Sequence, residues 1–163
     1  RPAQPSIIFP VRWPASVATS TAAVAALSQR ESTAVARMAE EHATAEDIQR
    51  LRESCSVVEQ DILSERDHSE NDVLFHVAIA KCTQNLVVPK LIPIITYAVK
   101  LFVSLTERRL RMETIVGHRD MLEAISAGDG RRAEQAMAQH IEYNRAMLQD
   151  IAGQLKKEDG GGE

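Results

Sequence analysis

The sequence contains few aromatic residues and little that suits a β-sheet protein. Phe, Trp and Tyr together make up 4% of the 163 residues, whereas hydrophobic residues make up 44%. Because a β-sandwich relies on aromatic and β-branched side chains, this composition disfavours one. The length is enough for a single domain with a sizeable core and too short for two comfortable ones.

The chain also lacks an excess of positive charge and a long hydrophobic run. Its formal net charge is −4, whereas a protein that binds nucleic acid by itself needs basic side chains to neutralise phosphates. No apolar run reaches the roughly 20 residues of a membrane-spanning helix. Residues 1–15 show no pattern of a secretory signal. We therefore expect no membrane partner and a cytoplasmic location.

Cysteine is scarce as well. Cys55 and Cys82 are the two cysteines of the chain, and they form no CxxC motif. Disulfides are rare in the reducing cytosol. We interpret both residues as buried, reduced thiols, with a disulfide between them as the alternative.

Proline and glycine divide the chain into three parts. Four of the six prolines fall within residues 1–15, a spacing that prevents a regular helix. Residues 1–18 are therefore predicted to be a Pro-rich tail or linker. Residues 155–163 end in KKEDGGGE, which predicts a flexible C-terminal tail. Residues 19–154 between them are predicted to form one helical domain.

Helical periodicity continues through the whole of that domain. We expect six helices, caps included, over about 19–41, 44–66, 69–83, 85–113, 114–127 and 129–154. Thr44 and Asp47 have the spacing of a capping box, and Gly128 is placed to end the fifth helix. Because the connections are short, neighbouring helices should be antiparallel. The predicted fold class is an all-α antiparallel bundle.

Several polar side chains fall on helix faces that are otherwise apolar. Asp72 and His76 are four residues apart and therefore neighbours on the face that carries Phe75 and Ile79. His118 takes one step of the stripe that Ile115, Leu122 and Ile125 form. His140 and Asn144 fall within the stripe of Ala133, Met137 and Ile141.

A buried carboxylate must be paired or coordinated, because its desolvation costs several kcal/mol. No Lys or Arg shares the stripe of Asp72. One cation held by Asp72, His76, His118 and His140 would satisfy all four, and hydrogen-bonded core histidines are the alternative. The ligand set suits Zn²⁺, Ni²⁺, Fe²⁺ or Mn²⁺ without choosing among them. We expect one divalent ion per chain and take Zn²⁺ as the first choice.

The remaining histidines have simpler interpretations. His42 is expected at the end of a helix, beside unsatisfied carbonyl groups. His68 lies in the polar stretch DHSEND. Both are predicted to be solvated.

Four stretches of the sequence resemble a known family. Residues 36–51 read ARMAEEHATAEDIQRL, 72–85 read DVLFHVAIAKCTQN, 117–129 read GHRDMLEAISAGD and 131–140 read RRAEQAMAQH. They occur in the order and with the gaps found in the C-terminal ligand-sensing (FCD) domain of the FadR branch of GntR-family bacterial transcription regulators. The resemblance covers about residues 35–151.

The resemblance implies an antiparallel bundle of six to seven helices around a central metal and ligand cavity, in a homodimer. In many members an Asp and three His hold a divalent metal, and these ligands correspond to Asp72, His76, His118 and His140 here. Family effectors are usually small carboxylates that complete the metal coordination. Family members bind DNA through a separate N-terminal winged helix-turn-helix, and these 163 residues contain no such sequence. The resemblance therefore implies a sensor domain and not an enzyme.

The effector would need contacts beyond the metal. Asn144 lies one turn after His140 and is expected to hydrogen-bond an effector. Arg108 or Arg109 is expected to pair with a second carboxylate group. The effector would then tie together the helices that carry Asp72, His118 and His140.

A metal-dependent hydrolase on a helical bundle is the alternative function. Such an enzyme needs a general base beside the metal-bound water. The nearest candidates in the sequence are Asp120, Glu123 and Glu142. Each lies far around its helix from the neighbouring histidine, which disfavours the hydrolase.

Overall fold

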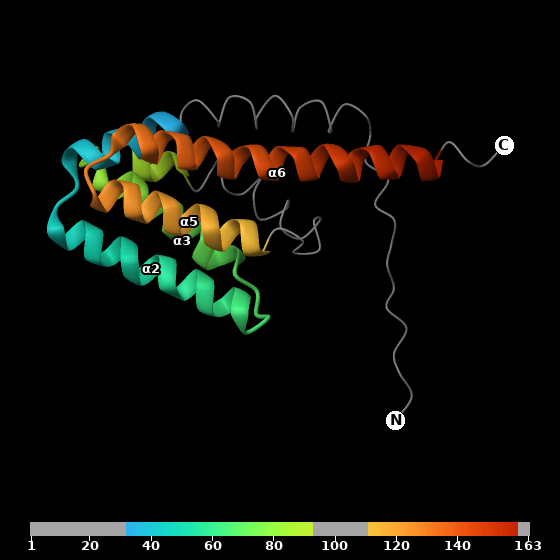
Figure 1. Ribbon diagram of the computed structural model, residues 1–163, viewed down its shortest axis with the longest axis horizontal. Helices are drawn as coiled ribbons and strands as arrows, with labels where there is room; N and C mark the ends of the chain where they lie inside the picture. Colours follow the sequence, from blue (N-terminus) through green and yellow to red (C-terminus); the bar gives the residue numbers. More distant parts are fainter. Residues whose placement is uncertain (1–31, 93–110, 160–163) are drawn as a thin grey trace.

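The protein is all-α, as predicted. The computed structural model describes residues 32–92 and 111–159, which are mostly helical and contain no strand. Helices α2 (Ala45–Leu63), α3 (Ser69–Cys82), α5 (Arg111–Ser126) and α6 (Gly130–Asp159) form the main body of this part (Figure 1). Residues 32–42 and 88–92 are also helical. None of these helices has both the length and the hydrophobicity needed to cross a membrane.

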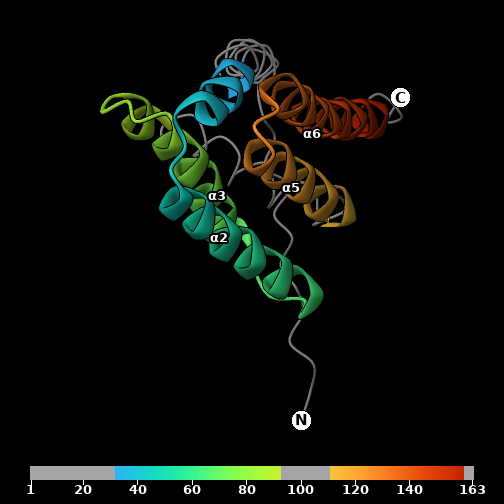
Figure 2. The ribbon, with the colours of Figure 1, turned by 60° about the vertical axis from the view of Figure 1, so that its left-hand side comes forward.

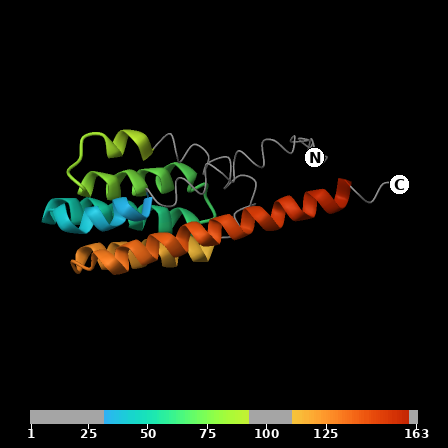
Figure 3. The same ribbon diagram turned by 90° about the horizontal axis from the view of Figure 1, so that it is seen from above.

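The helices pack as two antiparallel pairs. Helix α2 packs against α3 and also against α5, and α5 packs against α6. Residues 64–68 join the first pair and residues 127–129 the second, and Figure 2 shows both pairs side by side. Helix α6 runs antiparallel to α5 and continues well past the beginning of α5 (Figure 3). The short connections thus produce the antiparallel neighbours that the sequence predicts.

The core is made of apolar side chains at helical spacing on all four helices. On α2 they recur every three or four residues, so that one face of the helix is buried. The two thiols belong to this core: both are free, and burial raises the pKa of each to about 11. The prediction of buried, reduced cysteines is confirmed. The buried core residues of these helices are Leu51, Cys55, Val58, Ile62, Phe75, Ile79, Ala80, Cys82, Ile115, Met121, Ala124, Ile125, Ala133, Ala136 and Met137.

The beginning of α2 is tied to the end of α3. The Asp47 backbone N–H donates to the Thr44 hydroxyl at 3.1 Å, and the Thr44 N–H donates to the Asp47 carboxylate at 3.0 Å, which is the predicted capping box. Gln84, just after α3, donates to the same carboxylate at 2.7 Å. The Thr44 hydroxyl also donates to this carboxylate and is the main cause of the lowered pKa of Asp47.

The connection between α2 and α3 differs from the prediction. The N-cap of α3 is His68, without a side-chain capping bond, and not Ser69. His68 is buried, with 3% of its surface exposed, so the prediction that it is solvated is wrong. The reason is that Asp61 accepts hydrogen bonds from both Arg66 and Asn71. These bonds hold the loop close to the helix ends, so that His68 is buried although residues 64–67 remain exposed.

The predicted boundary between residues 113 and 114 is wrong, because α5 is continuous from Arg111 to Ser126. The predicted end of this helix and the beginning of α6 are close to those observed. Gly128, at φ 70°, ends α5 in the left-handed conformation that favours glycine, and Asp129 caps α6 through the Arg132 N–H at 2.9 Å. Helix α6 extends to Asp159, beyond the expected end at Gln154. The Pro-rich segment 1–18 lies outside the described residues, and the division of the chain at 18 and 154 stays a prediction.

The capping box predicts the effect of a single substitution on stability. Thr44→Ala removes the acceptor for the Asp47 N–H and should lower the free energy of unfolding by about 1 kcal/mol. Thr44→Ser keeps a hydroxyl and serves as the matched control. Chemical denaturation of both variants measures the difference, and equal loss in the two would contradict the role of the hydroxyl.

Candidate metal centre

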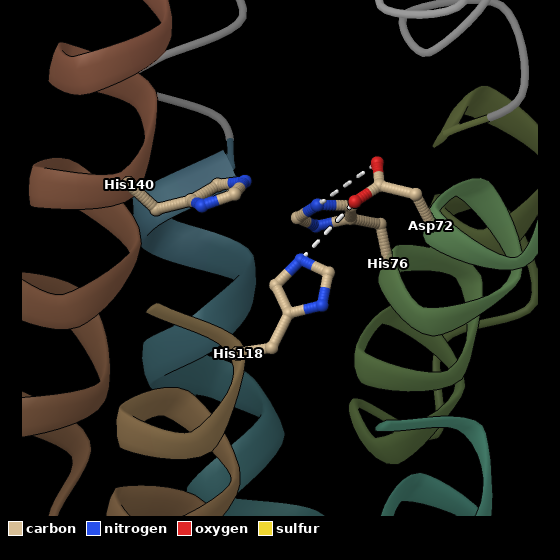
Figure 4. A group of neighbouring side chains, drawn as sticks. All are labelled: Asp72, His76, His118 and His140. Carbon is tan, nitrogen blue, oxygen red and sulfur yellow. Dashed lines mark ion pairs between the residues drawn. The ribbon is translucent and has the colours of Figure 1, made fainter. Parts of the chain in front are cut away.

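The structure brings the four sequence-predicted residues to one point between three helices. Asp72 and His76 lie on α3, His118 on α5 and His140 on α6 (Figure 4). One ligand atom from each residue lies within 4.8 Å of the other three. Asp72, His118 and His140 are buried, and only 11% of the His76 side chain is exposed. Donors that are distant in sequence therefore form one compact buried group.

The distances within the group are those of side chains in direct contact. His118 Nε2 lies 3.3 Å from Asp72 Oδ1, and His76 Nε2 lies 3.9 Å from Asp72 Oδ2. The centroids of the His118 and His140 rings are 5.0 Å apart, and that of His76 lies 5.3 Å from His118 and 5.4 Å from His140. Bonds of about 2.0–2.2 Å to Zn²⁺ place ligand atoms about 3 to 4 Å apart. The ligand atoms of the observed group lie within 4.8 Å of one another, so their spacing is slightly wider than in a zinc site.

The protonation states of the group suit a cation. Burial alone would raise the pKa of Asp72. The contact with His118 and the positive charges of the protonated histidines together lower it by more than burial raises it, so the pKa lies well below the usual range. Burial lowers the pKa of His76 to about 4, against the opposing attraction of Asp72. Burial likewise holds the pKa of His140 well below its usual value. At neutral pH the carboxylate is ionised, and His76 and His140 are neutral, as metal ligands must be.

Two buried polar atoms in the group lack a hydrogen-bond partner. Both ring nitrogens of His118 are buried without one, because the contact of Nε2 with Asp72 is outside hydrogen-bond geometry. Within the described part of the chain, the ion-pair partners of Asp72 are histidines. A buried unpartnered nitrogen is unfavourable, and a divalent cation would bind one of the two His118 nitrogens together with the Asp72 carboxylate. The residues present therefore fit a metal.

Two neighbours of the group were not predicted as site residues. Phe75 stacks on the His118 ring, with centroids 4.0 Å apart and an interplanar angle of 23°. Gly117 faces His140 so closely that a Cβ at position 117 would lie 3.0 Å from His140 Nδ1. The sequence signal for Gly117 is a glycine within a helix next to His118, where glycine is unfavourable.

The remaining predicted site residues have separate outcomes. The Asn144 amide lies 3.4 Å from His140 Nε2, so it borders the group as its spacing predicts. Arg108 and Arg109 lie outside the described residues. His42 is exposed, and its Nδ1 lies 3.1 Å from the Met38 carbonyl oxygen, in agreement with its predicted place at a helix end.

Two of the three acidic residues considered as a general base, Glu123 and Glu142, pair with arginines on the protein surface. Glu123 pairs with Arg132 at 2.8 Å, and Glu142 pairs with Arg145 at 2.8 Å, all on exposed side chains. Neither carboxylate is placed to act as a general base at the group. This agrees with the sequence argument against a hydrolase.

The buried histidines predict how stability depends on pH in the metal-free protein. The pKa of His76 is about 4 in the folded protein and about 6.5 when unfolded, so unfolding takes up a proton between these values. The free energy of unfolding should therefore fall as the pH falls from 6.5 to 4, by roughly 3 kcal/mol from His76 alone. His140 acts in the same direction.

Denaturation with a chelator present, at pH values from 7 to 4.5, measures this dependence. His76→Gln should make the profile less steep, with the contribution of His140 remaining, and His42→Gln, at an exposed histidine, should leave it unchanged. A flat profile in the unsubstituted chain, or an equally steep one in His76→Gln, would contradict the assignment.

The arrangement agrees with comparisons to known proteins. Residues 31–143, more than half of the chain, match the family model described as the FCD domain. A curated relative, the Uxu operon transcriptional regulator of Escherichia coli (strain K12), is 28% identical over 130 residues. That match covers 72% of this chain and 49% of the relative, so the chain spans about half the relative's length.

A solved structure supports the fold. The protein described as Streptococcus agalactiae GntR matches with a TM-score of 0.71 and 21% identity, over 82% of this chain and 62% of that one. The family is regulatory and not enzymatic, which confirms the sequence-based conclusion that the chain is not an enzyme. The chain therefore belongs to the FCD domain family.

Proposed function

We propose that this FCD domain senses a small carboxylate through one divalent metal ion held by Asp72, His76, His118 and His140. The observation that carries the proposal is the buried group of four donors from three helices, all within 4.8 Å. Zn²⁺ is the ion we expect, with Ni²⁺, Fe²⁺ or Mn²⁺ as alternatives that the donor types also suit.

The charge of the group supports an anionic effector. Asp72 contributes one negative charge, and His76 and His140 are neutral at neutral pH. A bound divalent ion would leave a net positive charge in a buried site and supply a coordination position for a carboxylate oxygen. The Asn144 amide, which lies 3.4 Å from His140 Nε2, would hydrogen-bond that carboxylate in this proposal. Arg108 and Arg109 remain proposed partners for a second carboxylate group.

The four donors come from three different helices, which suggests how effector binding would change the arrangement of the bundle. Asp72 and His76 belong to α3, His118 to α5 and His140 to α6, so ligand binding at the group would draw three helices together. A ligand shifts a conformational equilibrium only if it binds the two states differently. In our proposal the tightened bundle changes the spacing of two DNA-binding winged helix-turn-helix domains in a cytoplasmic homodimer.

Metal binding is the first test of the proposal. The protein should bind one divalent ion per chain, measured by elemental analysis and by calorimetric titration with Zn²⁺ or Ni²⁺. The double variant with His118→Ala and His140→Ala should lose this binding, because two of the four donors are gone. His42→Ala removes an exposed histidine and should bind as the unsubstituted chain does. No uptake of either ion by the unsubstituted chain would refute the proposal.

Carboxylate binding is the second test. A ligand at about 100 times its Kd adds about 2.7 kcal/mol of apparent stability, which corresponds to several degrees in Tm for a chain of this size. A thermal-shift screen of mono-, di- and tricarboxylates should therefore find a stabilising compound with metal-loaded protein. The shift should disappear in metal-stripped protein and shrink in Asn144→Ala. Survival of the shift without metal would contradict a metal-bridged effector.

A further inference from the structure

The approach of α5 to α6 depends on a residue without a side chain. Gly117 lies in the interior of α5, directly before His118, and faces His140 on α6. A Cβ at position 117 would lie 3.0 Å from His140 Nδ1, 3.3 Å from its Cβ and 3.4 Å from its Cγ. Ordinary van der Waals contacts between heavy atoms are longer, at about 3.5–4.0 Å. The backbone of α5 thus lies so close to the imidazole of His140 that even a methyl group would require the ring or the helix to move.

Rotation of the ring alone would not relieve this contact. Turning the imidazole about its Cβ–Cγ bond moves Nδ1 but leaves Cβ and Cγ of His140 in place. A methyl group at position 117 would therefore require the His140 side chain, or α6 as a whole, to move by a few tenths of an ångström. Either change moves the His140 nitrogens relative to Asp72, His76 and His118.

Packing also holds the ring of His118, the neighbouring proposed metal ligand, in its orientation. The His118 ring lies against Phe75, and neither of its nitrogens has a hydrogen-bond partner. Histidine ligands are usually oriented by a hydrogen bond from the nitrogen that does not bind the metal. Here the rings of His118 and His140 are supported by Phe75 and by the bare backbone of Gly117.

We propose that Gly117 is a positioning residue of the metal centre, whose missing side chain holds His140 at the distance where it joins the ligands on α3 and α5. This inference rests on the proposed metal binding. It also accounts for a glycine inside α5, where glycine is among the least favourable residues. Gly117 contributes no donor atom and acts through His140.

The test compares Gly117→Ala with Val116→Ala. Val116 is the preceding residue on α5 and is 54% exposed, so its truncation changes neither the group nor the contact between helices. Affinity for Co²⁺ and Zn²⁺ is measured by competition titration, the Co²⁺ absorption spectrum reports the ligand geometry, and circular dichroism reports the fold. Gly117→Ala should bind about 10- to 100-fold more weakly, the usual effect of losing support for a ligand, with an altered Co²⁺ spectrum. Val116→Ala should match the unsubstituted chain.

A second background keeps the test decisive if Gly117→Ala fails to fold. His140→Ala removes the two ring atoms that the new methyl group would meet at 3.0 and 3.4 Å and leaves only the 3.3 Å contact with the Cβ of residue 140. In that background Gly117→Ala should fold, cost less stability than it does with His140 present and leave the residual metal affinity unchanged, because most of the contact is gone and alanine favours the helix more than glycine. Unchanged affinity and spectrum in Gly117→Ala alone, or an unfolded double variant, would overturn the role of Gly117. Failure of the unsubstituted chain to bind metal would instead refute the proposed function on which this role rests.

Discussion

The arrangement of the bundle depends on one buried carboxylate. Asp72 lies among three histidines, and within the described residues no lysine or arginine is paired with it. A buried charge without compensation is costly, and neutral His76 and His140 offset little of it. The proposed divalent cation would offset this charge. The meeting of α3, α5 and α6 places the four donors within 4.8 Å of one another.

Contacts elsewhere in the fold hold in place the three helices that carry the four donors. The Thr44–Asp47 capping box and the Gln84 contact hold the beginning of α2 against the end of α3. Asp61 folds the loop that precedes the turn carrying Asp72, through Arg66 and Asn71. On the other side, Gly117 lets α6 approach α5. The polar contacts at the helix ends and the packing in the middle thus fix the site together.

Much of this could be predicted from the sequence, because helical spacing decides which residues share a face. Asp72 and His76 are neighbours at i and i+4, and His118 and His140 each fall in an apolar stripe, so all four could be assigned to the interior. The burial of His68 could not be predicted, since it depends on Asp61 reaching across the loop. The proposed role of Gly117 could not be predicted from the sequence either, because a close approach between two helices depends on their packing and not on local spacing.

The most direct test of the central claim is a crystal structure of the metal-loaded protein with diffraction data collected at the absorption edge of the metal. The account predicts one anomalous peak per chain, about 2.0–2.2 Å from a carboxylate oxygen of Asp72 and from one nitrogen each of His76, His118 and His140. A peak at any other position, or its absence from crystals that contain the metal, would contradict the account.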